Sequence, residues 1–252
     1  MITLIGLEGI PEVVPGDDLG QLIATALGAG AIGLEADDVL VVTQKIVSKA
    51  EGRVVELASV TPRPEALAWA ARWGKDPRQV ELVLQESAEV LRMAHGGLII
   101  SRTHRGLVCA NAGVDLSNVG GGDVATLLPV DPDASARALR ARLQELTGTA
   151  PAVIISDSFG RPWRNGIVNV AIGAAGIDAL LDLRGTLDAS GREMHSTVIA
   201  VADELASAAD LAGGKVAQRP VVLVRGYAFT AGTAGDGGAA ALVMDRELDL
   251  FP

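Results

Sequence analysis

The clearest indication of the fold class is PAVIISDSFGRPWRNG, residues 151–166. Its apolar and β-branched first half predicts a buried strand, which runs out into Asp157, Ser158 and Gly160. A helix is predicted directly before it, over residues 133–148. A helix followed by a buried strand with a polar end is typical of α/β proteins, in which functional loops gather at strand ends.

The rest of the chain alternates in the same way. The helix over 133–148 has Asp133 as its expected N-cap and Gly148 as its stop, and Asp17 and Asp18 open an earlier helix. We expect α/β or mixed α+β architecture, with mixed sheets and flanking helices, in a single unit spanning 1–252. The other predicted elements are strands over 1–7, at the start of 38–57 and over 220–226, a hairpin of 97–101 with 106–110, helices over 63–74, 77–93 and 196–214, and a mobile surface loop over 230–242.

Composition excludes several classes of protein. The 252 residues are 49% hydrophobic, and 31 Asp and Glu outnumber 21 Lys and Arg, for a formal charge of -10. Such an acidic chain has no general surface for nucleic acid or anionic membranes. The single Cys109 excludes an intramolecular disulfide, and the N-terminus lacks a basic segment followed by an apolar run. We therefore expect a cytoplasmic protein that binds neither nucleic acid nor membrane.

A second polar strand end occurs in VCANAGVDLSNV, residues 108–119, which carries Asp115. Turn chemistry is the simpler explanation, because Asn and Asp hydrogen-bond their own backbone. However, Asp115 and Asp157 both follow apolar strands, and a carboxylate pair is a usual holder of Mg²⁺ or Mn²⁺ beside phosphates. The Ser158 hydroxyl would add a third oxygen ligand. No Walker A or GxGxxG sequence is present.

Phosphate contacts would have to come from scattered cations. Singly, each candidate is most simply a solvated surface residue, but together they follow strand ends or glycine turns in an acidic protein. The histidines His95, His104 and His195 lack the spacing of metal ligands. The candidate phosphate contacts are Lys49, Arg161, Arg164, Lys215 and Arg225.

Several segments in order along the chain resemble the motifs of the coenzyme F420-0:L-glutamate ligase family. They include GIPEVVPGDDL, VVTQKIVSKAEGR, QESAEVLR, CANAGVDLSNV, SDSFGRPWRNGIVNVAIGAAGI, DLRGTLDASGREMHSTVIAVADELASAADL and VVLVRG. The resemblance implies a GTP-dependent enzyme that uses Mg²⁺ or Mn²⁺ and is stimulated by K⁺. It would add L-glutamate to the lactyl carboxylate of coenzyme F420-0 and extend a γ-linked tail through an acyl phosphate. It also implies an intertwined homodimer with a mixed α/β fold.

Carried over residue by residue, the resemblance assigns the metal to Asp115, Asp157 and Ser158. The cations expected to share the charge of the transferring phosphoryl group are Lys49, Arg161 and Arg164. The expected nucleotide contacts are Ile10, Pro11, Glu12, Val13, Thr43, Gln44, Lys49, Asn118, Gly213, Gly214, Lys215, Val216, Ala217, Gln218, Arg219 and Pro220.

One position departs from the family pattern, because some relatives carry a glutamate, a candidate second-metal ligand, where this chain has Lys215. A protonated lysine has no lone pair for a metal. Either the second ion has fewer protein ligands here, or Lys215 contacts phosphate. With no flavin-binding domain after Pro252, the chain resembles the free-standing form. Two alternatives stay open: a related amino-acid ligase with another acidic acceptor, and a nucleotide-binding module without catalysis.

Overall fold

A mixed five-stranded sheet organises the molecule. The computed structural model describes residues 1–116, 123–232 and 238–249. Within them the sheet order is β1 (Thr3–Gly6), β12 (Val221–Arg225), β2 (Val39–Thr43), β8 (Ala152–Arg161) and β9 (Arg164–Ala175). Only β2 and β8 are neighbours in parallel; the other pairs are antiparallel. This confirms the predicted mixed α/β class.

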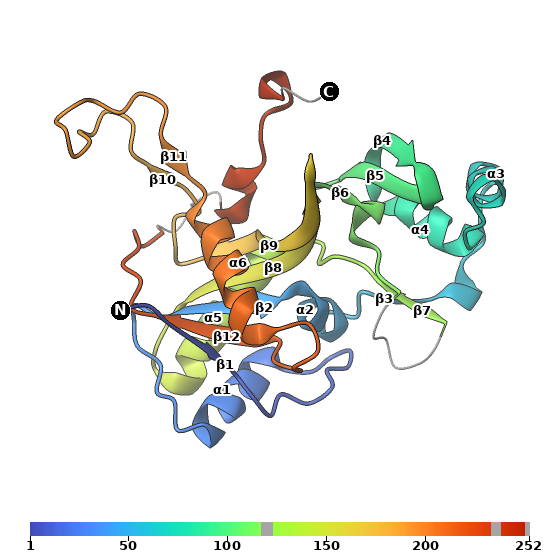
Figure 1. The fold of residues 1–252 in the computed structure, drawn as a ribbon. Helices are drawn as coiled ribbons and strands as arrows, with labels where there is room; N and C mark the ends of the chain where they lie inside the picture. The colour runs from blue at the N-terminus through green and yellow to red at the C-terminus, as the bar shows by residue number, and fades with distance from the viewer. Residues whose placement is uncertain (117–122, 233–237, 250–252) are drawn as a thin grey trace.

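Helices cover both faces of this sheet (Figure 1). On one face α1 (Leu19–Ala29), α2 (Gln44–Ala50) and α5 (Pro132–Thr147) pack against the strands, and on the other α6 (Val201–Gly213) does so. Strand β2 is a run of apolar residues because both of its faces are covered, as expected for a central strand. The two sides form separate hydrophobic clusters, with Leu40 in one and Val41 in the other.

A lobe built from the middle of the chain lies beside the sheet (Figure 1). The chain enters it along β3 (Val54–Glu56) and returns along β7 (Val124–Thr126), which pair antiparallel. Between them lie η1 (Leu57–Ser59), α3 (Pro64–Trp73), α4 (Pro77–Glu86), β4 (Ser87–Ala94), η2 (His95–Gly97), β5 (Leu98–Thr103), β6 (Val108–Ala110) and η3 (Asn111–Gly113). The lobe has its own hydrophobic cluster, around Leu57, Val80 and Ile99. That 1–252 acts as one unit stays a prediction.

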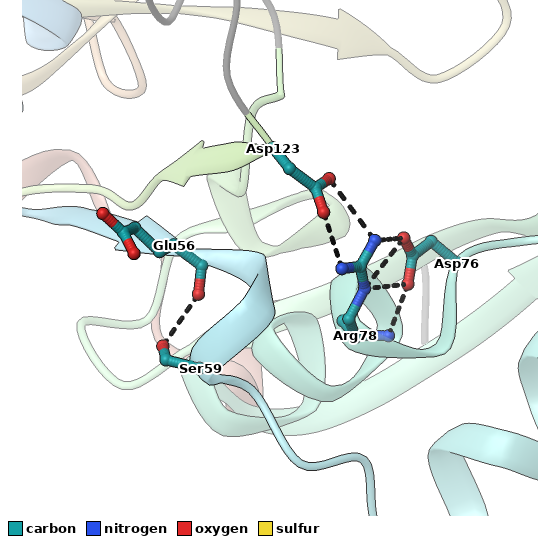
Figure 2. A network of polar contacts seen from close by, with 5 residues as sticks. All are labelled: Glu56, Ser59, Asp76, Arg78 and Asp123. Carbon is teal, nitrogen blue, oxygen red and sulfur yellow. Dashed lines mark hydrogen bonds and ion pairs between the residues drawn. The ribbon is translucent and has the colours of Figure 1, made fainter.

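Polar contacts fix the base of this lobe (Figure 2). The Arg78 guanidinium, in the first turn of α4, donates to Asp76 Oδ2 at 2.6 Å and to Asp123 Oδ2 at 2.6 Å. Asp76 is also the N-cap of α4 and accepts from the Arg78 backbone N–H. The start of α4 is therefore tied to the residue that precedes β7.

The remaining elements project from the body of the molecule. Strands β10 (Leu181–Asp182) and β11 (Val198–Ile199) form the base of a long arm, and the β8–β9 hairpin extends beyond the sheet (Figure 1). Two short helical turns, η4 (Gly238–Leu242) and η5 (Arg246–Leu248), end the described chain. None of the helices in the described ranges is both long and apolar enough to cross a membrane.

Several sequence predictions of elements are confirmed. The helices over 63–74 and from Asp18 form as α3 and α1, with Asp18 accepting from the Gln21 N–H as N-cap. The predicted hairpin forms as β5 and β6. Gly148 ends α5 with a left-handed φ of 77°.

The helix predicted over 77–93 is wrong in its second half. Helix α4 ends at Glu86, and residues 87–94 form β4, which pairs antiparallel with β5. The Ser87 hydroxyl donates to the Val83 carbonyl at 2.5 Å and closes the last turn. Pairing with β5 outweighs the local helix preference of these residues, since propensity is a weak prior beside tertiary contacts.

Three other element predictions need correction. The N-cap of α5 is Asp131 rather than Asp133, whose carboxylate instead accepts from Ala174 N and Ala239 N, both at 2.8 Å. The helix predicted over 196–214 begins only at Val201. The loop predicted over 230–242 contains the partly buried turn η4, while residues 233–237 lie outside the described residues.

Candidate functional site

A cavity of about 1130 Å³ opens at the edge of the sheet where β2 ends. Because β2 and β8 are parallel, their carboxyl ends face the same edge, where ligands of open α/β sheets bind. Strand β8 runs on to Arg161, so Asp157 and Ser158 lie within it, just past its last pairing with β2 at Thr43↔Ser156. The strand end predicted at Asp157 is therefore the end of the parallel pairing, and both residues line the cavity.

Asp157 is the carboxylate at the centre of this edge. Burial raises the pKa of Asp157 to about 6, and the negative charge of Asp115 adds to the rise. The Ser158 backbone N–H, the Lys215 charge and a hydrogen bond from the Gln44 side chain oppose it. Two carboxylates whose negative charges oppose each other favour a positive charge near them.

Asp115 reaches the cavity from the lobe. A tight turn precedes it, in which Asn111, Ala112 and Gly113 all have left-handed φ values. A side chain at Gly113 would meet Leu128 at 2.5 Å, so only glycine fits. Asp115 then pairs through its backbone with Thr126, and Lys45 Nζ lies 2.6 Å from its Oδ2. Asn111 has the left-handed backbone of a turn residue, but its Oδ1 accepts from Ile99 N of β5 rather than from its own turn, and Asp115 lines the cavity.

Ser158 is held between two neighbours. Its hydroxyl donates to Asn169 Oδ1 at 2.7 Å, and Lys215 Nζ donates to the same hydroxyl. Asn169 is buried on β9, directly opposite Ser158 in register, and lines the cavity. Asn169 was not among the predicted site residues, although a polar residue between Val168 and Val170 was a signal.

Helix α2 contributes two lysines to the cavity. Lys49 is buried and forms an ion pair with the Glu12 carboxylate, whereas Lys45 pairs with Asp115. The helix follows β2 without a loop, so Thr43 and Gln44 also line the cavity. Lys45 was not among the predicted site residues.

Most of the expected nucleotide contacts meet at this cavity. Residues 10–13 and most of the loop after α6 line it, in addition to Thr43, Gln44 and Lys49. Gly213 is the buried last residue of α6, and Gly213 and Ala217 are absent from the described lining residues. Asn118 lies outside the described residues. The lining residues from these segments are Ile10, Pro11, Glu12, Val13, Gly214, Lys215, Val216, Gln218, Arg219 and Pro220.

Three arginines that were candidate phosphate contacts do not line the cavity as described. Arg161 and Arg164 sit at the turn of the projecting β8–β9 hairpin, and neither is among the described residues that line the cavity. Arg225 ends β12, which runs antiparallel to β2, so it lies at the opposite edge of the sheet. There its guanidinium binds Asp38 Oδ2 at 2.7 Å and Glu35. Phosphate contact by Arg225 is therefore a wrong prediction.

The donor set of the cavity fits a divalent cation with few protein ligands. Asp115, Asp157 and Ser158 provide hard oxygen atoms, as Mg²⁺ and Mn²⁺ prefer, and Mg²⁺ commonly keeps several waters and substrate oxygens. No cluster of three His, Cys, Asp or Glu side chains suited to a metal occurs among the described residues. A site here would rest on two carboxylates and a hydroxyl, with Lys45 and Lys215 moving away from their present partners.

Comparisons with known proteins agree with this picture. The family model described as F420-0:Gamma-glutamyl ligase matches residues 9–226. A protein of Methanothermobacter thermautotrophicus named coenzyme F420:L-glutamate ligase is 49% identical over 251 residues, covering 99% of this chain and 98% of its own length. Proteins of the same name from Methanopyrus kandleri and Methanocaldococcus jannaschii are 47% and 40% identical, covering 89% and 99% of this chain and 88% and 96% of their own lengths.

The mixed α/β fold and its cavity therefore belong to an enzyme of the ligase class. The chain is a member of the F420-0:gamma-glutamyl ligase family. The resemblance read from the ordered motifs is confirmed.

Proposed function

We propose that this chain joins L-glutamate to the carboxylate of coenzyme F420-0 and then extends a γ-linked glutamate tail, at the expense of GTP. The relatives' names support the acceptor and the amino acid. The observation that carries the proposal is the cavity in which Asp115, Asp157 and Ser158 meet Lys49 and Lys215. Opposed carboxylates and lysines in one cavity suit a metal-bound polyphosphate.

The chemistry follows from the weakness of a carboxylate as an acyl donor. An acceptor carboxylate oxygen attacks the γ-phosphorus of GTP, the bond from that phosphorus to the bridging oxygen breaks, and GDP leaves. The glutamate amine then attacks the carbonyl carbon of the acyl phosphate, the carbon–oxygen bond to phosphate breaks, and the amine releases a proton. Inorganic phosphate and the amide are the products.

Different residues of the cavity have different roles in this reaction. When bound, Mg²⁺ or Mn²⁺ at Asp115, Asp157 and Ser158 supplies positive charge to the phosphate oxygens. Lys49 is the protein cation assigned to the transferring group, since its buried ammonium stands in the cavity wall. Lys215, beside Ser158, is assigned to phosphate, and K⁺ is proposed as an activating ion.

The positions of Arg161 and Arg164 support a homodimer. Their hairpin projects away from the sheet (Figure 1), and it carries the exposed apolar residues Trp163 and Ile167. Roles for these arginines in phosphoryl transfer therefore require the cavity of a second copy. An intertwined dimer would cover the apolar residues and bring the arginines to that cavity.

Mass spectrometry of the products tests the function directly. The full chain is incubated with F420-0, L-glutamate, GTP and Mn²⁺, and we expect F420-0 to gain successive glutamate residues while GDP accumulates. Omitting each component in turn is the control. GDP formation with an unmodified acceptor would contradict the ligase assignment, and modification of a different acidic acceptor alone would indicate the related ligase.

A further inference from the structure

Lys45 is the cavity lysine that holds a carboxylate of the candidate metal set. Its Nζ lies 2.6 Å from Asp115 Oδ2, and its side chain is 23% exposed. The two residues come from different parts of the fold, α2 and the lobe, and both line the cavity. An ammonium ion and a divalent cation therefore compete for the same carboxylate.

Lys45 and Lys49 are one helical turn apart on α2 and both line the cavity. Like charges at this spacing destabilise a helix, with Cβ atoms about 5–6 Å apart. Here each lysine is offset by a separate acid, Asp115 or Glu12. Both lysines therefore reach the same cavity from one helix.

Competition at Asp115 determines where Lys45 goes. A divalent cation held by this carboxylate would repel the adjacent ammonium, and the long, flexible lysine stem would let that charge move within the cavity. The displaced ammonium then needs another anion, and Lys49 on the next turn marks where one is expected. In the nucleotide-free protein Lys45 thus opposes metal binding, and in the full complex it favours phosphate binding.

We infer that Lys45 is a further catalytic residue, which leaves Asp115 when the divalent cation binds and contacts the phosphate chain of the nucleotide together with Lys49. This inference rests on the proposed function and adds a residue to it. Lys45 exchanges no proton and forms no covalent bond; it contributes charge to the transferring group. A lysine that only held Asp115 in position would instead assist metal binding.

Mn²⁺ binding to the nucleotide-free protein distinguishes a Lys45 that competes with the metal and then contacts phosphate from a Lys45 that only positions Asp115. Free Mn²⁺ is followed by electron paramagnetic resonance during titration of the wild-type chain, Lys45→Met and Lys45→Gln. We expect Mn²⁺ to bind both variants about threefold more tightly or better, the scale of a partly exposed ion pair. At saturating Mn²⁺ we expect GTP affinity to fall roughly tenfold or more and turnover roughly a hundredfold.

Lys75→Met is the matched control, because Lys75 is exposed and outside the described lining of the cavity. It removes the same charge and should change neither affinity. Unchanged or weaker Mn²⁺ binding in both Lys45 variants, or unchanged GTP affinity, would overturn the role of Lys45. If that result is obtained with a wild-type chain that ligates glutamate, the role of Lys45 is wrong and the proposed function stands. A wild-type chain that makes no ligated product overturns the proposed function, whatever the Mn²⁺ affinities are.

Discussion

Lys45 Nζ lies 2.6 Å from Asp115 Oδ2, so a lysine of the helix that follows β2 is bound to a carboxylate of the lobe. This ion pair joins the sheet and the lobe at the cavity. Asp115 also lies close enough to Asp157 for its charge to add to the rise that burial causes in the pKa of Asp157. The chemistry assigned to the cavity depends on these two carboxylates.

Removing either carboxylate charge should abolish ligation and leave the fold intact. Asp115→Asn and Asp157→Asn keep the side-chain shape but provide a weaker, neutral ligand. Product formation at saturating Mn²⁺ and thermal unfolding are measured for each, with the exposed Asp37→Asn as the matched control. Near-normal turnover in either variant would remove that residue from the candidate metal set.

Lys49→Ala should slow phosphoryl transfer by roughly a hundredfold or more, the scale expected for loss of one preorganised electrostatic contact. Lys49 is buried beside Glu12 and faces the cavity. Rapid-quench measurement of GDP formation in a single turnover reports this step, with Lys75→Ala as the control. A transfer rate close to that of the wild type would show that Lys49 only balances Glu12.

Some residues of the candidate site could be predicted from the sequence, and others could not. Asp157 was predictable because a buried strand running into polar residues indicates a sheet edge. Asn169 was not assigned, because its role depends on the cross-strand register that sets it opposite Ser158. Arg225 was misplaced because strand direction decides which edge it reaches, and local sequence does not reveal that β12 is antiparallel to β2.

The elements of the fold were also predictable only where local sequence pattern determines them. The continuous apolar strands and the capped helices were predictable from local pattern, as α1 and α3 show. Strand β4 was missed because it forms only by pairing with β5. Asp133 was taken as a helix cap, although its carboxylate is used by backbone N–H groups of Ala174 and Ala239 that the fold brings to it.

The Glu81–Arg63 pair should make the stability of the lobe depend on pH. Hydrogen bonds from the half-exposed Arg63 guanidinium lower the pKa of the buried Glu81 from 4.5 to about 2. Since the folded pKa lies below the unfolded value, the stabilisation is complete above about pH 4.5 and is lost as pH falls toward 2.

Glu81→Gln should therefore lower the free energy of unfolding by about 1.5–3 kcal/mol at pH 7, as expected when hydrogen bonds to a charged group are lost. The difference from the wild type should shrink as pH falls below 4.5. Urea unfolding over a pH series measures it, and the exposed Glu56→Gln is the control. A difference that stays constant between pH 7 and pH 3 would contradict the charge-based account.

Two copies of the 25.8 kDa chain should associate in solution. Trp163 is 80% exposed at the tip of the β8–β9 hairpin, so Trp163→Asp should shift the protein toward a monomer. Light scattering at micromolar concentration measures the mass, with Leu67→Asp on α3 as the comparison. A wild-type chain with the mass of a single copy would refute the dimer.

The origin of the oxygen in the released phosphate shows whether an acyl phosphate forms. In the proposed route, residues of this cavity move the γ-phosphoryl group of GTP onto the acceptor carboxylate before glutamate reacts. The acceptor carboxylate is labelled with oxygen-18, the reaction is run with GTP, L-glutamate and Mn²⁺, and the released phosphate is analysed by mass spectrometry. When the reaction is stopped after the first addition, we predict one labelled oxygen in each released phosphate, because later additions use the unlabelled γ-carboxylate of the glutamate already attached. Amide product accompanied by unlabelled phosphate would contradict the acyl-phosphate route and the roles assigned to Lys45, Lys49 and the two carboxylates.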